Sequence, residues 1–353
     1  MRITVLTRAS RLAYALAAVT ACAYIFIASA QSTQTGQWTI TSKPGSENVH
    51  LMLSYQGRFG GNNNTSFSIS PERLQGLTRS QMMASGQVVK FQLVRDAGTL
   101  SCEGWFNDGR GSGHFAYIAN PRFAADLQRL GYGSPTVEQQ FSMTLHDVGL
   151  ALIEELRSQG YEQATIDQLV RMGTHGVRVE YVRELGAMGY NLKSVDKLVR
   201  MRDHGVSISF IKELGELGYN RLAAEELVRA KDHGVNPSFV REVVEAGYKD
   251  LSLEQLVRMR DHGVSTEFIK GMEEAGYSRL PVEQLVRMRD HGVSPAYVKE
   301  VRSLGYDNLT VEQLVRMRDH GVSPEFIRKM KERGFNNVSV EELIRLRDHG
   351  FDR

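Results

Sequence analysis

The histidines are the residues of this chain that are best placed to do chemistry, because they recur at a single interval. The chain has 353 residues and ten histidines, and eight of the ten follow one another every 29 residues. Asp precedes most of them, and in three later copies the whole segment Arg-Met-Arg-Asp-His is identical. The candidate repeated surface is Arg258, Arg260, Asp261, His262, Arg287, Arg289, Asp290, His291, Arg316, Arg318, Asp319 and His320. Imidazole and carboxylate groups serve as metal ligands and as proton donors or acceptors, so a metal site and a catalytic site are the two kinds of chemistry that these residues could support.

Metal binding and catalysis both fit this pattern poorly. Neighbouring helices pack about 10 Å apart, which is too far for two histidines to share a metal at roughly 2 Å per ligand. Adjacent Asp and His residues on a helix point apart. A catalytic centre needs one asymmetric group of residues, and the chain has no HExxH, Gly-x-Ser-x-Gly or phosphate-loop motif. We therefore predict no catalytic residues, no metal, no cofactor and no enzymatic activity.

Three interpretations of the repeated polar residues remain open. The first is a solvated face on which Glu, four residues before Arg, forms pairs within one helix, each worth about 0.3–0.5 kcal/mol. These expected pairs are Glu225–Arg229, Glu254–Arg258, Glu283–Arg287, Glu312–Arg316 and Glu341–Arg345. The second is recent duplication, because surface substitutions usually change stability by no more than about ±0.5 kcal/mol. The third is a ligand that repeats along the array and contacts each copy.

A 29-residue repeat predicts the fold of the C-terminal two thirds. Gly-Tyr occurs at the same interval, and the eight glycines of the series are Gly131, Gly160, Gly189, Gly218, Gly247, Gly276, Gly305 and Gly334, the last followed by Phe. In the copy that starts at Ser252, Ser252 and Gln255 form a capping box, and Gly263 ends the first helix, called A. Later copies open a second helix, B, with Ser-Pro, as at Ser294. Two short helices per repeat predict an α-solenoid of about eight repeats.

The start of the array departs from this pattern. Asn120-Pro121 already resembles the start of a B helix. In the next copy, Asp147 replaces the usual Gly and Leu150 replaces the usual Pro, so we expect a longer or less kinked helix there. Tyr277, Phe268 and their equivalents occupy apolar helix positions, so we expect them to pack between repeats.

The segment before the array alternates apolar and polar residues, which is typical of half-buried strands. Runs from Asn48, Val89, Leu100 and Gly113 predict an antiparallel β domain, and Asn107-Asp108-Gly109 predicts a hairpin turn. The segment 59–65 reads as a polar loop. The glycine-bearing segment 109–113 lacks the context of a phosphate loop, so we interpret it as a strand. His50 and His114 are expected to be ordinary sheet residues.

The first 30 residues resemble a secretory signal. Three arginines precede an uncharged stretch, residues 12–30, that ends Ala28-Ser29-Ala30, which predicts cleavage before Gln31. The alternatives are an uncleaved membrane anchor, since 19 residues nearly span a bilayer, and a lipoprotein site at Cys22. Cleavage after Ala30 would leave Cys102 as the single cysteine, which we expect to be buried. The 43 basic and 41 acidic residues nearly cancel, so no nucleic-acid partner is predicted.

The repeat, with its Leu-Val-Arg-Met-Arg-Asp-His-Gly-Val core, resembles repeats of exported bacterial proteins. It is also similar to the extracytoplasmic tails of membrane zinc metallopeptidases of the β-lactam-sensor antirepressor family. The segment from Val89 through Phe115 resembles the region that accompanies those repeats. The peptidase motif and its membrane helices are absent from this sequence. The resemblance implies a sensing or interaction role in the cell envelope.

Together these observations predict an α+β protein made of separate domains. Residues 1–30 would be the signal peptide or anchor, 31–119 the antiparallel β domain and 120–353 the helical-repeat array. We expect a periplasmic or secreted, non-catalytic scaffold that binds a protein or peptide. The alternatives are a binder of a periodic envelope polymer such as polysaccharide, and a regulatory partner of an envelope peptidase system. A membrane contact is expected only through residues 12–30, if they are not cleaved.

Overall fold

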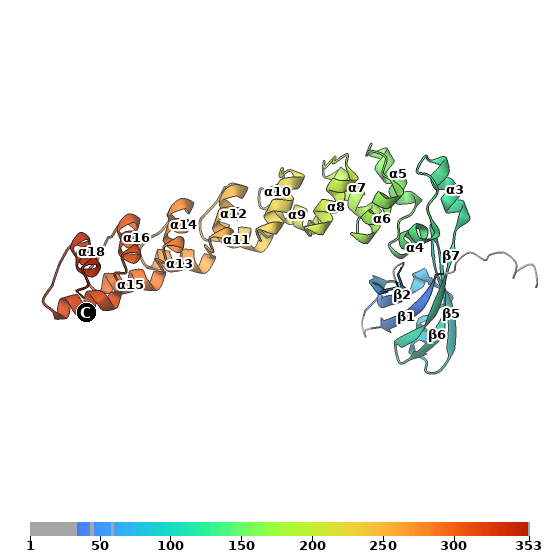
Figure 1. The fold of residues 1–353 in the computed structure, drawn as a ribbon, viewed down its shortest axis with the longest axis horizontal. Coiled ribbons are helices and arrows are strands. Elements are labelled where there is room, and N and C mark those ends of the chain that lie inside the picture. Colours follow the sequence, from blue (N-terminus) through green and yellow to red (C-terminus); the bar gives the residue numbers. More distant parts are fainter. Residues whose placement is uncertain (1–33, 43–45, 58–59, 352–353) are drawn as a thin grey trace, which may run out of the picture. The chain divides into compact units, whose positions relative to one another are not determined.

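A computed structural model describes residues 34–42, 46–57 and 60–351. The predicted signal segment, the cleavage site and Cys22 lie outside these residues. Seven strands form one antiparallel sheet in the order β3-β2-β1-β7-β6-β5-β4 (Figure 1). The strands are β1 (Thr35–Ser42), β2 (Val49–Gln56), β3 (Asn62–Ile69), β4 (Leu74–Gln75), β5 (Val88–Arg95), β6 (Gly98–Asn107) and β7 (Arg110–Ala119). A 3-10 helix, η1 (Pro71–Arg73), and the helix α2 (Arg79–Met83) connect β3 to β4 and β4 to β5.

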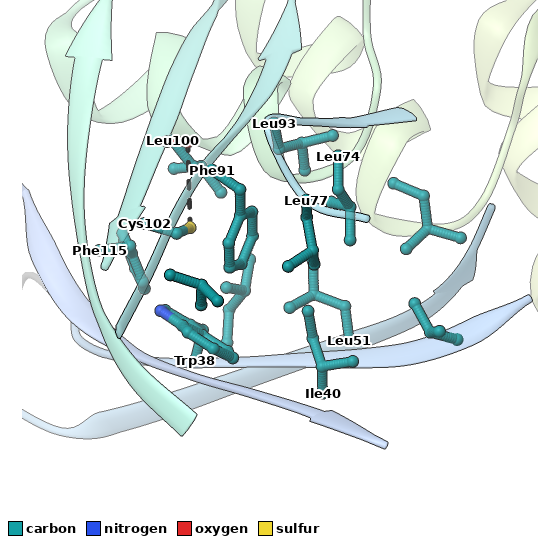
Figure 2. Close-up of a cluster of buried hydrophobic side chains, with 14 of the residues drawn as sticks. Trp38, Ile40, Leu51, Leu74, Leu77, Phe91, Leu93, Leu100, Cys102 and Phe115 are labelled. Carbon is teal, nitrogen blue, oxygen red and sulfur yellow. Dashed lines mark hydrogen bonds between the residues drawn. The ribbon is translucent and has the colours of Figure 1, made fainter. Parts of the chain in front are cut away.

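The alternating residues of each strand bury one face of the sheet, as the sequence predicts. Trp38 is fully buried there and packs edge-on against Phe91, with the ring centroids 4.9 Å apart. Figure 2 shows these side chains gathered on the inner side of the curved strands. Gly104 makes room for the Trp38 ring, because a Cβ at Gly104 would lie 2.6 Å from it. Cys102 belongs to the same cluster, so the expected burial of this thiol is confirmed.

The predicted strand runs and the hairpin are confirmed, but the predicted loop at 59–65 is wrong in part. Residues from Asn62 onward form β3, which pairs with β2 along its whole length. The strand begins with three exposed edge residues, Asn62, Asn63 and Asn64. Because asparagine has a low strand propensity, the sequence does not indicate a strand here, and the pairing with β2 stabilises it. Asp108 and Gly109 have φ values of 46° and 76°, the left-handed pair that a tight two-residue hairpin requires.

Up to residue 351, where the description of the chain ends, sixteen nine-residue helices follow the sheet and alternate between B and A. The B helices are α3 (Pro121–Arg129), α5 (Leu150–Ser158), α7 (Val179–Ala187), α9 (Ile208–Glu216), α11 (Pro237–Glu245), α13 (Thr266–Glu274), α15 (Pro295–Ser303) and α17 (Pro324–Glu332). The A helices are α4 (Val137–Leu145), α6 (Ile166–Thr174), α8 (Val195–Asp203), α10 (Ala224–Asp232), α12 (Leu253–Asp261), α14 (Val282–Asp290), α16 (Val311–Asp319) and α18 (Val340–Asp348). No helix within the described part of the chain is both long enough and apolar enough to cross a membrane.

These helices begin and end where the sequence predicts. Ser252 and Gln255 form the complete capping box of α12, and Gly263 follows with a φ of 65°. Ser294 caps α15 ahead of Pro295, and Asn120 caps α3. From α8 to α18, A helices pack on A helices and B helices on B helices, which gives two rows (Figure 1). The predicted fold class, a small antiparallel β domain followed by a helical-repeat array, is confirmed.

The expectation of a longer or less kinked helix near Asp147 is wrong. The helix α4 ends at Leu145, and Asp147 adopts the left-handed conformation (φ 58°) that Gly has in other repeats. Asp tolerates this conformation better than most residues, so the turn survives the substitution. The helix α5 has no Ser cap of its own; instead the carboxylate of Asp96, in the sheet, accepts from the N–H of Leu150 at 2.8 Å.

The helix α4 packs against the sheet. Phe141 of α4 contacts the rings of Tyr55, Phe115 and Tyr117. Arg95, at the end of β5, donates to the carbonyl oxygens of Thr144 and Leu145. The sequence changes from strand to helix near residue 120, but the compact bodies divide later, one ending at Arg183 and the other beginning at Glu184.

Candidate functional site: the repeated surface of the helical array

Each histidine of the candidate surface pairs with an aspartate of the next repeat. The His262 Nδ1 lies 2.8 Å from the Asp290 Oδ1, and the two side chains are 40% and 42% exposed. The same contact, between residues 28 apart, occurs five times in the C-terminal body, at 2.5–3.0 Å. The pairs are His204–Asp232, His233–Asp261, His262–Asp290, His291–Asp319 and His320–Asp348.

The second arginine of each motif covers an aromatic ring of the previous repeat. The Arg289 guanidinium lies 5.4 Å from the ring centroid of Phe268, which is 4% exposed. The equivalent contacts are Lys231 on Phe210, Arg260 on Phe239, Arg318 on Tyr297 and Arg347 on Phe326. A cation over a ring face is attracted by the ring quadrupole, so this arginine also joins two repeats.

The expected Glu–Arg pairs within one helix are wrong. The first arginine instead reaches the glutamate of the next A helix, as in Arg287–Glu312 at 2.6 Å. The others are Arg200–Glu225, Arg229–Glu254 and Arg316–Glu341, at 2.6–3.7 Å. The reason is geometric: A helices pack side by side, so a glutamate in the first turn of one helix comes within reach of the arginine before it.

The Gly-Tyr tyrosine makes a further repeated contact. The Tyr277 hydroxyl donates to the carbonyl oxygen of Leu309, and four more tyrosines do the same with a residue 32 positions later. These are Tyr190–Leu222, Tyr219–Leu251, Tyr248–Leu280 and Tyr306–Val338. Burial raises the pKa of the Tyr277 hydroxyl, so the proton that makes this hydrogen bond is retained. The expected packing of Tyr277 and Phe268 between repeats is confirmed.

Eleven of the twelve candidate residues therefore contact a neighbouring repeat, and Arg258 is exposed without such a described contact. The signal for the His–Asp pairs was in the sequence: Asp precedes His by one residue, so His and the next Asp are 28 apart. Contacts between repeats account for identity at these eleven positions. Recent duplication and a repeating ligand stay open as interpretations of the uniform surface.

The B helices carry the variation that the A helices lack. We name the second, sixth and eighth residues of α9, α11, α13, α15 and α17 the B ridge. It consists of Ser209, Glu213, Gly215, Ser238, Glu242, Val244, Glu267, Gly271, Glu273, Ala296, Glu300, Arg302, Glu325, Lys329 and Lys331. None of these side chains is buried. All three positions vary, and the eighth varies most: it changes from Gly through Val and Glu to Arg and Lys along the array.

The described residues were also compared with what a metal site or a reactive nucleophile requires. Across residues 34–42, 46–57 and 60–351, no group of three or more His, Cys, Asp and Glu side chains lies close enough to hold a metal ion. Burial raises the pKa of the Cys102 thiol to about 12, so the reactive thiolate is scarce at neutral pH. His50 and His114 lie on exposed positions of β2 and β7, as expected.

No family model, no curated protein and no solved structure matches this chain.

Proposed function

We propose that this protein is a non-catalytic scaffold of the cell envelope that binds a protein or peptide along the B ridge. One observation carries the proposal. The uniform positions of the array are engaged in contacts between repeats. The B ridge differs from repeat to repeat and none of its residues is buried, although Glu242 and Glu300 on it also contact the next repeat. A uniform surface suits a periodic ligand, while a surface that changes along the array suits one particular partner in one register.

The charges of the B ridge indicate the charges that the partner should carry. Its α13 residues include Glu267 and Glu273, while its α17 residues include Lys329 and Lys331. A partner that binds along this row would carry basic groups opposite α13 and acidic groups opposite α17, because complementary potentials select both partner and orientation.

The envelope location is part of the same proposal. It is supported by the signal-like residues 1–30 and by the resemblance to repeats of exported bacterial proteins, including the tails of envelope metallopeptidases. A regulatory partnership with such a peptidase system is the form that this resemblance favours. Mass spectrometry of the protein recovered from an envelope fraction should find a chain that begins at Gln31, and an intact Met1 in the cytoplasm would contradict export.

The binding experiment compares two variants of the full chain. Proximity crosslinking in an envelope extract identifies the captured proteins, and the strongest is then purified and titrated. Lys329→Glu with Lys331→Glu, on the B ridge, should weaken its binding about tenfold or more. Arg287→Gln, which breaks a contact between A helices, should leave the affinity unchanged. If both variants bind equally well, or if no protein is captured, the proposed use of the B ridge is wrong.

A further inference from the structure

The outer face of the sheet, which belongs to the other compact body, has an arrangement that the packing of the fold does not require. Its side chains alternate with the buried ones on β1, β7, β6 and β5. Strand register places them in straight rows across the sheet. In one row, Gln37 lies beside His114, His114 beside Glu103, and Glu103 beside Lys90. With neighbouring strands about 4.8 Å apart, this polar row is roughly 14 Å long.

A second row, polar except for Ala116, runs parallel to the first, and the two rows line a depression. This row consists of Thr35, Ala116, Ser101 and Gln92, in register on the same four strands. The depression has a volume of about 630 Å³ and is lined by side chains of both rows. Lys90 and Glu103 form an ion pair of 3.2 Å while remaining 74% and 61% exposed, so the acid and the base offset each other. The floor therefore offers hydrogen-bond donors and acceptors with little net charge.

Exposed apolar side chains flank this polar band on both sides. On one side, Trp105 and Val88 are direct cross-strand neighbours and are 54% and 68% exposed. On the other side lie Ile118 and Val94, which are 56% and 43% exposed. These are four of the seven large apolar side chains that are exposed in the described part of the chain. Such a concentration on one face points to a binding surface rather than to chance exposure.

The arrangement does not suit a protein partner. Protein interfaces have an apolar centre and a polar rim, and here the polar band is central and the apolar groups lie at its edges. An added peptide strand would use the edges of the sheet, which are β3 and β4, rather than its face. A strongly charged polymer would meet a floor whose charges nearly cancel.

We propose that this face binds a neutral saccharide chain. A sugar ring has an apolar C–H face, which can stack on the Trp105 ring, and hydroxyl groups around its edge that both donate and accept hydrogen bonds. The Gln37 amide and the Glu103 carboxylate accept from sugar hydroxyls, while Lys90 and the Gln37 amide nitrogen donate to their oxygens. The straight polar rows suit consecutive sugars of one chain lying across the strands.

This site is separate from the B ridge, and its test is independent of the proposed protein partner. The chain has two tryptophans, and Trp38 is fully buried, so only Trp105 is open to iodide quenching. The full chain is titrated with neutral tetrasaccharides of glucose, mannose and N-acetylglucosamine. The proposal predicts that at least one of them shields Trp105 from iodide in a saturable way while the emission of Trp38 stays constant.

Calorimetry then compares variants with the same tetrasaccharide. Trp105→Ala should weaken binding about tenfold or more, as the loss of an aromatic anchor does, and Trp105→Phe should lose less. Gln37→Ala tests the polar band. Met83→Ala is the matched control, because Met83 is 57% exposed but lies on α2 rather than on this face. The proposal is overturned if no tetrasaccharide protects Trp105, if Trp105→Ala binds as the control does, or if Trp105 becomes protected through self-association at higher protein concentration.

Discussion

The contacts between the repeats of α12–α13 and α14–α15 give a quantitative prediction about the array. Three substitutions remove one contact each: Asp290→Ala removes the partner of His262, Arg289→Met removes the cation over Phe268, and Tyr277→Phe removes a hydrogen-bond donor. Each leaves the apolar core between the helices intact, since Leu256, Leu285 and Met288 are not changed. The effect on stability should therefore come from the coupling between repeats.

The magnitude follows from exposure. An exposed ion pair such as His262–Asp290 is worth about 0.2–1 kcal/mol. A cation over a ring at a site open to water is worth about 0.5–1 kcal/mol. The tyrosine hydrogen bond is worth about 0.5–1.5 kcal/mol. Because the three contacts lie at one interface, they need not add exactly, and the triple variant should lose about 1–3.5 kcal/mol of the free energy of unfolding.

Amide hydrogen exchange measured by mass spectrometry suits this prediction better than a single melting curve, because repeat arrays can unfold in parts. A loss of about 1.4 kcal/mol raises the rate of exchange through local opening about tenfold. The increase should be largest in α12 to α15 and should fade toward α9, because each repeat contacts only its neighbours. Glu245→Gln, an exposed substitution on α11, serves as the control.

Equal exchange in α12 to α15 of the triple variant and of Glu245→Gln would contradict this prediction. Equally faster exchange in every helix from α9 to α18 would also contradict it, because that result would mean that the array opens as one unit.

Three further predictions concern buried groups. Leu256→Ala should cost about 2–5 kcal/mol, since Leu256 is 1% exposed and truncation leaves a cavity; urea unfolding followed by circular dichroism measures this, with Arg258→Gln on the same helix as control. Burial, with the charges of Arg178 and Arg95, lowers the pKa of His146 from 6.5 to about 4. In the unfolded chain, His146 binds a proton below about pH 6.5, whereas in the native protein it binds one only below about pH 4. The free energy of unfolding should therefore fall as the pH drops from about 6.5 to about 4. His146→Gln should reduce that fall, and an identical fall in both proteins would show that other groups cause it. Cys102 should react with a thiol reagent only in denaturant, because burial raises its pKa to about 12; rapid labelling of the native protein would contradict its burial.

Local signals were sufficient to predict the helical array. The 29-residue period, the hydroxyl caps and the glycines after each A helix all act within one repeat, so they can be read directly from the sequence. The hairpin at Asp108-Gly109 is equally local, because its backbone conformation limits which residues fit.

The features that were missed depend on residues far apart in the chain. The strand β3 begins with three asparagines and is a strand because β2 pairs with it. The turn at Asp147 keeps the left-handed conformation of the other repeats. The helix after it is capped by Asp96 of the sheet, which lies 54 residues before Leu150 in the chain and so could not be identified as the cap from the local sequence. The arginines were expected to pair within a helix, yet they reach the neighbouring helix because packing brings it closer than the sequence suggests.

We propose that the uniform surface joins the repeats and that the variable B ridge, although Glu242 and Glu300 on it also contact the next repeat, binds the partner. The most direct test measures stability and partner affinity on the same two full-length variants, Asp290→Ala from the uniform surface and Lys329→Glu/Lys331→Glu from the B ridge. We expect Asp290→Ala to speed exchange in α12 to α15 and to leave the partner's Kd unchanged, and we expect the B ridge variant to do the reverse. If Asp290→Ala instead abolishes binding without loosening the array, the uniform surface is the binding site and the proposed role of the B ridge is wrong.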